Sequence, residues 1–138
     1  MQVALGDVNW PAVLVAAAVA FAIGGAWYGG VFGRAWIRLH GYTEEQVASM
    51  RVSQGRTFLI MFGSELVMAA VLAVLIEASG AGSVTGALVV ALLAAGIALM
   101  TDALQNAAHR KSLAAYALDA GHTVVIFAVM GLILGAWR

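Results

Sequence analysis

The chain of 138 residues has no cysteine, a single proline and few charged side chains, which make up 10% of it. The absence of cysteine excludes disulfide bonds, thiolate nucleophiles and Cys-ligated zinc or iron–sulfur sites. Seven basic and seven acidic residues cancel, and no long basic run occurs, so the electrostatic signature of nucleic-acid binding is missing. We therefore expect no nucleic-acid partner.

Apolar residues are abundant instead and make up 63% of the chain. An average soluble domain is about half apolar and about a quarter charged. A helix of a soluble core carries an apolar stripe, whereas whole segments of this chain are apolar on every side. The sequence therefore predicts a single all-α domain over residues 1–138 that is integral to a membrane, with the lipid bilayer as its first partner.

Four segments are long enough to cross a bilayer, which takes about 20 mostly apolar residues. They are residues 10–28, 57–78, 84–104 and 116–137. We expect them to form a four-transmembrane-helix bundle. Only the connection between the first and second helices, residues 29–56, has room for structure of its own.

Basic residues predict the orientation, because short loops rich in lysine and arginine stay in the cytoplasm. Six of the seven basic residues lie in the first and third connections, which four helices place on the same side. We therefore expect the inner (plasma) membrane of a bacterium, with both termini outside the cytoplasm. The first helix lacks the basic start of a cleaved signal peptide, so we expect it to be kept.

Small residues recur at four-residue spacing, which lets membrane helices approach closely. One series is Gly25, Gly29 and Gly33, and Gly131 with Gly135 repeats the spacing on the last helix. Each series alone is a weak signal. Together they predict tight helix packing. If one series of small residues faces a second copy of the chain, they also predict a homo-oligomer such as a dimer or trimer.

The long cytoplasmic connection contains an amphipathic stretch. Phe32 and Trp36 fall near one helical face, while Arg34 and Arg38 fall on others, which suits a short helix lying in the membrane interface. The following Thr-Glu-Glu-Gln from Thr43 predicts a capping box that opens a second short helix. This collar can be purely structural, or it can dock a partner protein.

The chain also resembles a known family. The matching residues near its beginning are Trp27, Tyr28, Phe32, Gly33, Trp36, Gly41, Glu44 and Glu45, with Arg34 in the place of a lysine. Together with the closing AGHTVVIFAVMGLILGAW, they resemble the bacterial membrane family catalogued as domain of unknown function 1761. Where that family has Ser-Pro, this chain has Gly29 and Gly30. The resemblance implies a four-helix membrane fold and carries over no catalytic residue.

Polar side chains within the spans are costly in hydrocarbon, so each suggests a function. The candidates for a polar pocket in the cytoplasmic third are Glu65, His122, Asp119, Asp102 and Asn106. At 1.5 Å per residue, Glu65 lies roughly 12 Å and His122 roughly 9 Å from the inner ends of their helices. A histidine beside carboxylates titrates near physiological pH, as a proton relay requires.

Other interpretations of these residues remain open. Asp102 and Asp119 are close enough to the boundary to form structural ion pairs with Arg110 or Lys111. We expect His40 and His109 to be ordinary loop residues.

The polar residues of the spans favour neither a bound metal or cofactor nor an enzymatic reaction. A metal site from Glu65, Asp119 and His122 has only composition in its favour, and a haem would need methionine as its second ligand. We therefore expect neither metal nor cofactor. A carboxylate and an imidazole can act as general acid and base, but no Ser, Cys or HExxH pattern supports catalysis, so the sequence leans against an enzyme without excluding one.

The sequence thus leaves two hypotheses. One is an oligomeric protein that transports a proton, a cation or a small solute through the polar pocket. The other is a non-catalytic membrane component that docks a partner through residues 32–56.

Overall fold

The computed structural model describes residues 5–109 and 112–137, and these are helical almost throughout. The elements in chain order are η1 (Leu5–Asp7), α1 (Trp10–Gly25), η2 (Ala26–Val31), α2 (Gly33–His40), α3 (Glu44–Val52), α4 (Gln54–Ala78), α5 (Val84–Ala108) and α6 (Leu113–Ala136). No strand occurs in these two ranges, so the predicted all-α fold is confirmed.

Four helices are long and apolar enough to cross a membrane: α1 continued through η2, α4, α5 and α6. This confirms the predicted number. Large apolar side chains on their outer faces are exposed, among them Leu59, Val67 and Ile97. Such a surface suits hydrocarbon rather than water, because a soluble protein rarely exposes so much contiguous apolar area.

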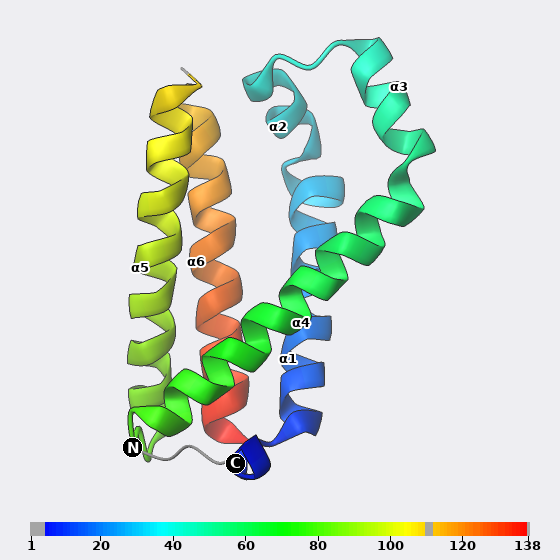
Figure 1. The fold of residues 1–138 in the computed structure, drawn as a ribbon. Helices are drawn as coiled ribbons and strands as arrows, with labels where there is room; N and C mark the ends of the chain where they lie inside the picture. Colours follow the sequence, from blue (N-terminus) through cyan, green and yellow to red (C-terminus); the bar gives the residue numbers. More distant parts are fainter. Residues whose placement is uncertain (1–4, 110–111, 138) are drawn as a thin grey trace.

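The bundle is closed at one end and spread at the other (Figure 1). α5 and α6 lie side by side along their length, while α4 crosses α1 obliquely and moves away from α5 toward α2 and α3. At the closed end the first and last spans meet, and the Asn9 side-chain amide donates to the Trp137 carbonyl oxygen at 3.3 Å. The two termini therefore lie on the same side of the bundle.

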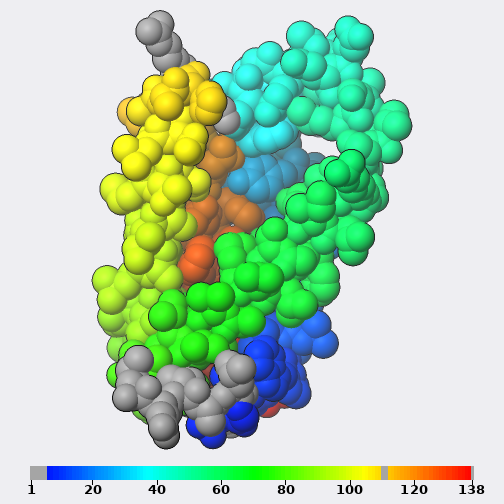
Figure 2. Space-filling model, viewed as in Figure 1, coloured from blue at the N-terminus to red at the C-terminus, as the bar shows by residue number. Residues whose placement is uncertain are grey.

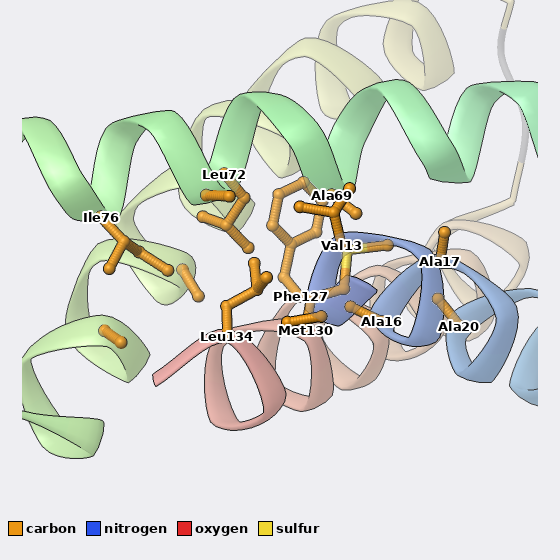
Figure 3. Packing of buried hydrophobic residues seen from close by; sticks show 14 of the residues in the cluster. Val13, Ala16, Ala17, Ala20, Ala69, Leu72, Ile76, Phe127, Met130 and Leu134 are labelled. Atoms are coloured by element: carbon orange, nitrogen blue, oxygen red, sulfur yellow. The ribbon is translucent and has the colours of Figure 1, made fainter. Parts of the chain in front are cut away.

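The hydrophobic core occupies the closed half of the bundle (Figure 3). Its largest fully buried side chains are Val13, Leu72, Ile76 and Met130, from α1, α4 and α6. Ala16 and Ala20 of α1 are completely buried, because a methyl side chain leaves room for neighbouring backbones to approach.

Gly131 and Gly135 form the contact between α6 and α5. A Cβ at Gly131 would lie 2.5 Å from the Ala91 Cβ, and one at Gly135 would lie 2.7 Å from the Ala87 Cβ. Gly25 and Gly29 differ, because a Cβ at either would meet nothing within 4 Å. The series from Gly25 is therefore not a seam between helices of this chain, and that expectation is corrected.

Local hydrogen bonds fix where the short helices begin. The Thr43 hydroxyl accepts from the Gln46 backbone N–H at 3.2 Å, and the Thr43 N–H donates to the Gln46 side chain at 2.9 Å. This confirms the predicted capping box at α3. Gly41, with φ 69°, ends α2 in the left-handed conformation that glycine adopts without strain.

The junction between α1 and α2 is a π-helical turn. The Phe32 N–H donates to the Trp27 carbonyl oxygen, five residues back, at 2.8 Å. Gly33 then packs directly on the Tyr28 backbone, where a side chain would not fit. The wider turn ends the first span and brings α2 back against α6.

Candidate functional site

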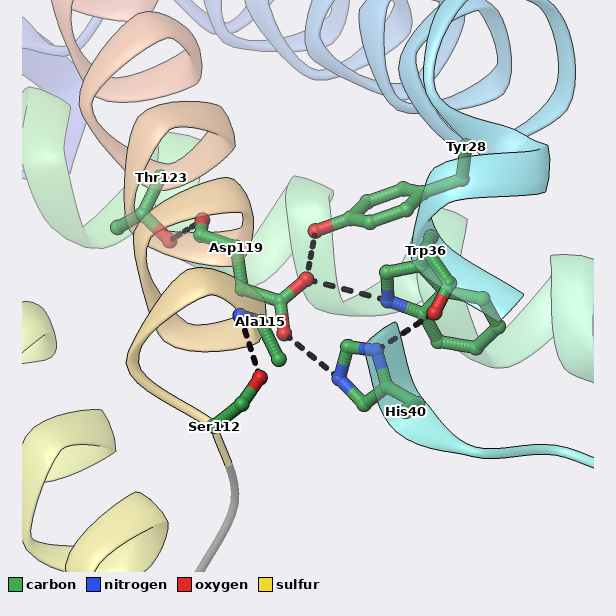
Figure 4. Close-up of polar contacts among 7 residues, drawn as sticks. All are labelled: Tyr28, Trp36, His40, Ser112, Ala115, Asp119 and Thr123. Atoms are coloured by element: carbon green, nitrogen blue, oxygen red, sulfur yellow. Dashed lines mark hydrogen bonds and ion pairs between the residues drawn. The ribbon is translucent and has the colours of Figure 1, made fainter. Parts of the chain in front are cut away.

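Asp119 of α6 binds three side chains from the segment that follows the first span (Figure 4). Its Oδ1 accepts from the Tyr28 hydroxyl at 3.1 Å and from the Trp36 indole N–H at 3.2 Å. Its Oδ2 lies 3.1 Å from Nε2 of His40, whose side chain is only 4% exposed. The carboxylate thereby fastens η2 and α2 to α6.

Both ring nitrogens of His40 face oxygen atoms. Nδ1 lies 2.9 Å from the Trp36 carbonyl oxygen, and Nε2 faces the Asp119 carboxylate. The two contacts connect the His40 imidazole to its own helix and to α6.

Aromatic rings complete this cluster. The Trp36 ring centroid lies 4.7 Å from that of His40 and 5.1 Å from that of Tyr42, and the His40 and Tyr42 rings are stacked at 5.7 Å. Trp36 and His40 are one helical turn apart on α2, which places them on the same face. The left-handed turn at Gly41 then brings Tyr42 back over both rings.

A cavity of about 850 Å³ lies beside this cluster, in the spread half of the bundle. Figure 2 shows the hollow between α4 and α5, with α6 visible behind it. Its lining includes Phe21, Tyr28, Trp36, His40, Tyr42, Gln54, Phe58, Met61, Asp102, Gln105, Asn106, Tyr116 and Asp119. The size is that of a small-molecule site, and the mixture of rings with a few polar groups is typical of one.

Asp102 supplies the charge of this cavity. Its side chain is exposed, and it forms neither a hydrogen bond nor an ion pair with any residue that the structure describes. No lysine or arginine lines the cavity within the described ranges. Within the described ranges, the cavity wall thus carries the Asp102 carboxylate without a basic partner.

The predicted polar pocket is thus divided. Asp102, Asn106 and Asp119 line the cavity, as do Gly25 and Gly29 of the glycine series. Glu65 and His122 do not line it and are buried, with 7% and 9% of their surfaces exposed.

His122 and Glu65 each keep a polar atom without a hydrogen-bond partner, Nε2 and Oε2 respectively. The His122 ring packs between aromatic rings, with its centroid 4.9 Å from that of Tyr28 and 5.9 Å from that of Trp27. Among the described residues, no group of three or more His, Asp or Glu side chains could hold a metal ion. Glu65, Asp119 and His122 therefore do not form the metal site considered from the sequence.

The residues of the predicted interface collar lie on α2. Trp36 donates its indole N–H to Asp119, and Phe32 packs on Trp27 with ring centroids 4.7 Å apart, so both partly buried rings contact the bundle. Arg34 and Arg38 are exposed. The role of this helix as a collar or a docking surface stays a prediction.

His40 is the residue that the sequence analysis missed. It was expected in a loop, but it is the last residue of α2 and is fastened to Asp119. Its position four residues after Trp36 was the available signal, because this spacing places both side chains on the same face of a helix. The predicted partners of Asp119, Arg110 and Lys111, lie outside the described residues.

Comparison with known families matches residues 11–135 to the family described as protein of unknown function (DUF1761). The match covers all four long helices except the first residue of α1 and the last residue of α6, and it includes every residue that lines the cavity. The chain belongs to this family. No curated protein and no solved structure shows significant similarity to it.

For this DUF1761 member, the family description assigns no activity, so function must be argued from the site.

Proposed function

We propose that this DUF1761 protein is a transport protein that binds a small cationic solute in the cavity between its spans. The observation that carries the proposal is the cavity of about 850 Å³, in whose described wall Asp102 has no partner and no lysine or arginine occurs. Such a wall favours positive charge, and the surrounding hydrocarbon strengthens the attraction.

The aromatic lining supports the same class of solute. The faces of Tyr28, Trp36 and Tyr116 carry partial negative charge, and cations bind over such faces. The Tyr116 ring is held in place because its hydroxyl donates to the Leu99 carbonyl oxygen at 3.0 Å. Fixed rings lose little conformational entropy when a solute binds.

The cavity lies at the end of the bundle that carries most of the arginines. By the positive-inside rule, this end faces the cytoplasm and both termini face outward. A solute bound there would be taken from, or released to, the cytoplasmic side of the membrane. Oligomerisation through an outer helix face belongs to the same proposal and leaves the cavity within each chain.

Uptake into proteoliposomes tests the proposal, with radiolabelled tetramethylammonium as the probe. We expect wild-type vesicles to accumulate the label and Asp102→Asn vesicles to lose about tenfold or more of the initial rate, because a charge-assisted contact contributes about 1.5–3 kcal/mol. Glu45→Gln is the matched control, since it removes an exposed carboxylate from α3, outside the cavity. Equal uptake by wild-type and Asp102→Asn vesicles would reject the proposal.

A further inference from the structure

The cavity changes in chemistry along its length. Its shallow part holds the carboxylate of Asp102 and the amide side chains of Gln54 and Gln105. Its deep part is lined by Phe21 and Met61, together with glycine and alanine of α1. Seven residues separate Tyr28 from Phe21 on the first span, so the two parts are about 10 Å apart.

Aromatic contacts close the side of the cavity between α1 and α4. The Phe21 ring meets those of Phe58 and Phe62 edge to face, with centroids 5.9 Å and 5.7 Å apart. These contacts hold α4 to α1 at the level of the deep part.

The opposite side, between α4 and α5, is open (Figure 2). α4 lies near α5 only toward the closed end and diverges from it at the level of the cavity (Figure 1). Both helices span the membrane, so this opening faces the acyl chains of the bilayer. A ligand can therefore reach the cavity sideways from the lipid.

From this geometry we infer that the cationic solute is an amphiphile, an ammonium head with an alkyl or aryl tail, which enters from the bilayer between α4 and α5. The head binds at Asp102 beside the rings of Tyr28 and Tyr116, and the tail occupies the deep part between Phe21 and Met61. This inference rests on the proposed function and adds the apolar tail of the solute and its route of entry into the cavity.

The charge of the cavity selects among the molecules that a membrane contains. An anionic amphiphile would place its head against Asp102 with no lysine or arginine of the described wall to compensate it. A cation without a tail would leave the deep apolar part unfilled. A cationic amphiphile satisfies both parts at once.

A chain-length series tests the inference by direct binding to the protein in zwitterionic lipid nanodiscs. The probes are tetramethylammonium, butyltrimethylammonium and hexyltrimethylammonium, and binding to empty nanodiscs is subtracted. We expect the affinity to rise about fourfold for each methylene that enters the deep part. Hexanesulfonate, which has the same tail with an anionic head, should show no binding above that of empty nanodiscs.

Substitutions locate the tail. Met61→Trp fills the deep part and should bring the affinity ratio of hexyltrimethylammonium to tetramethylammonium close to one. Leu59→Trp is the matched control, because Leu59 lies on the same helix, is 74% exposed and does not line the cavity. It should keep the wild-type ratio.

The outcomes separate the two proposals. Equal affinity for all three ammonium probes would overturn the amphiphile and leave the cation site standing. Binding of hexanesulfonate as strong as that of hexyltrimethylammonium would overturn the selection by charge. If none of the ammonium probes bound above empty nanodiscs, both the inference and the proposed function would fail.

Discussion

Asp119 and Asp102 lie at similar distances from the ends of their helices, yet their surroundings differ. Asp119 accepts hydrogen bonds from a tyrosine and a tryptophan and contacts a histidine ring nitrogen, and so positions α2. Asp102 has no such partner among the described residues and is exposed to the cavity. One carboxylate therefore holds the structure together, and the other is available to a ligand.

This difference predicts that removing the Asp119 carboxylate destabilises α2, whereas removing the Asp102 carboxylate does not. Asp119→Ala leaves the donors of Tyr28, Trp36 and His40 unpaired, and each buried unpaired group costs about 1–3 kcal/mol. We expect the amides of α2 to exchange hydrogen at least about tenfold faster in a hydrogen-exchange measurement. Asp102→Asn removes a carboxylate of similar depth without a bond, so its α2 amides should exchange at the wild-type rate. Equal exchange in wild type and Asp119→Ala would show that the cluster does not hold α2.

Among the helices, α5 and α6 are held closest, through glycine on one and alanine on the other. Gly131 and Gly135 of α6 meet Ala91 and Ala87 of α5, so the two helices pack closely as a pair. α4 has a different relation to the bundle, because aromatic rings hold it to α1 while the cavity separates its first half from α5. Tight packing on one side and a gap on the other give the bundle its spread end.

Gly131→Ala should therefore destabilise the bundle. The added methyl would overlap the Ala91 side chain, and overpacking of this kind costs about 1–3 kcal/mol. Gly96→Ala adds the same methyl within α5 at a place with no atom within 4 Å, so it should keep or slightly raise stability. Thermal unfolding in detergent compares the two variants, and an unfolding temperature for Gly131→Ala at or above that of Gly96→Ala would contradict the packing argument.

For the molecule as a whole, orientation in the membrane decides which compartment the cavity faces. The α4–α5 turn lies at the closed end with the termini, while α3 lies at the spread end beside the cavity (Figure 1). The two positions must therefore be on opposite sides of the membrane. The distribution of basic residues predicts that α3 lies in the cytoplasm.

Labelling tests this orientation cleanly, because the chain has no cysteine of its own. Gly82→Cys, in the α4–α5 turn, should react with a membrane-impermeant maleimide added to intact cells. Ala48→Cys, on the exposed surface of α3, should react only after the membrane is permeabilised. The reverse pattern would invert the orientation and place the cavity at the outer surface.

The fold was largely predictable from the sequence, because in hydrocarbon each span must satisfy its own backbone hydrogen bonds within a helix. That requirement makes length and apolar composition sufficient to identify four spans. The capping box at Thr43 was equally readable, since both of its hydrogen bonds lie within four consecutive residues.

The site was predictable only in part. Asp102, Asn106 and Asp119 were recognised as polar residues at similar depth, but the partners of Asp119 lie 79 to 91 residues away along the chain. Which side chains meet depends on the π-helical turn after α1 and on the oblique path of α4, and neither follows from residue composition. Local chemistry and the bilayer thus specify the helices of this protein, whereas long-range packing of those helices creates the cavity and sets Glu65 and His122 apart from it.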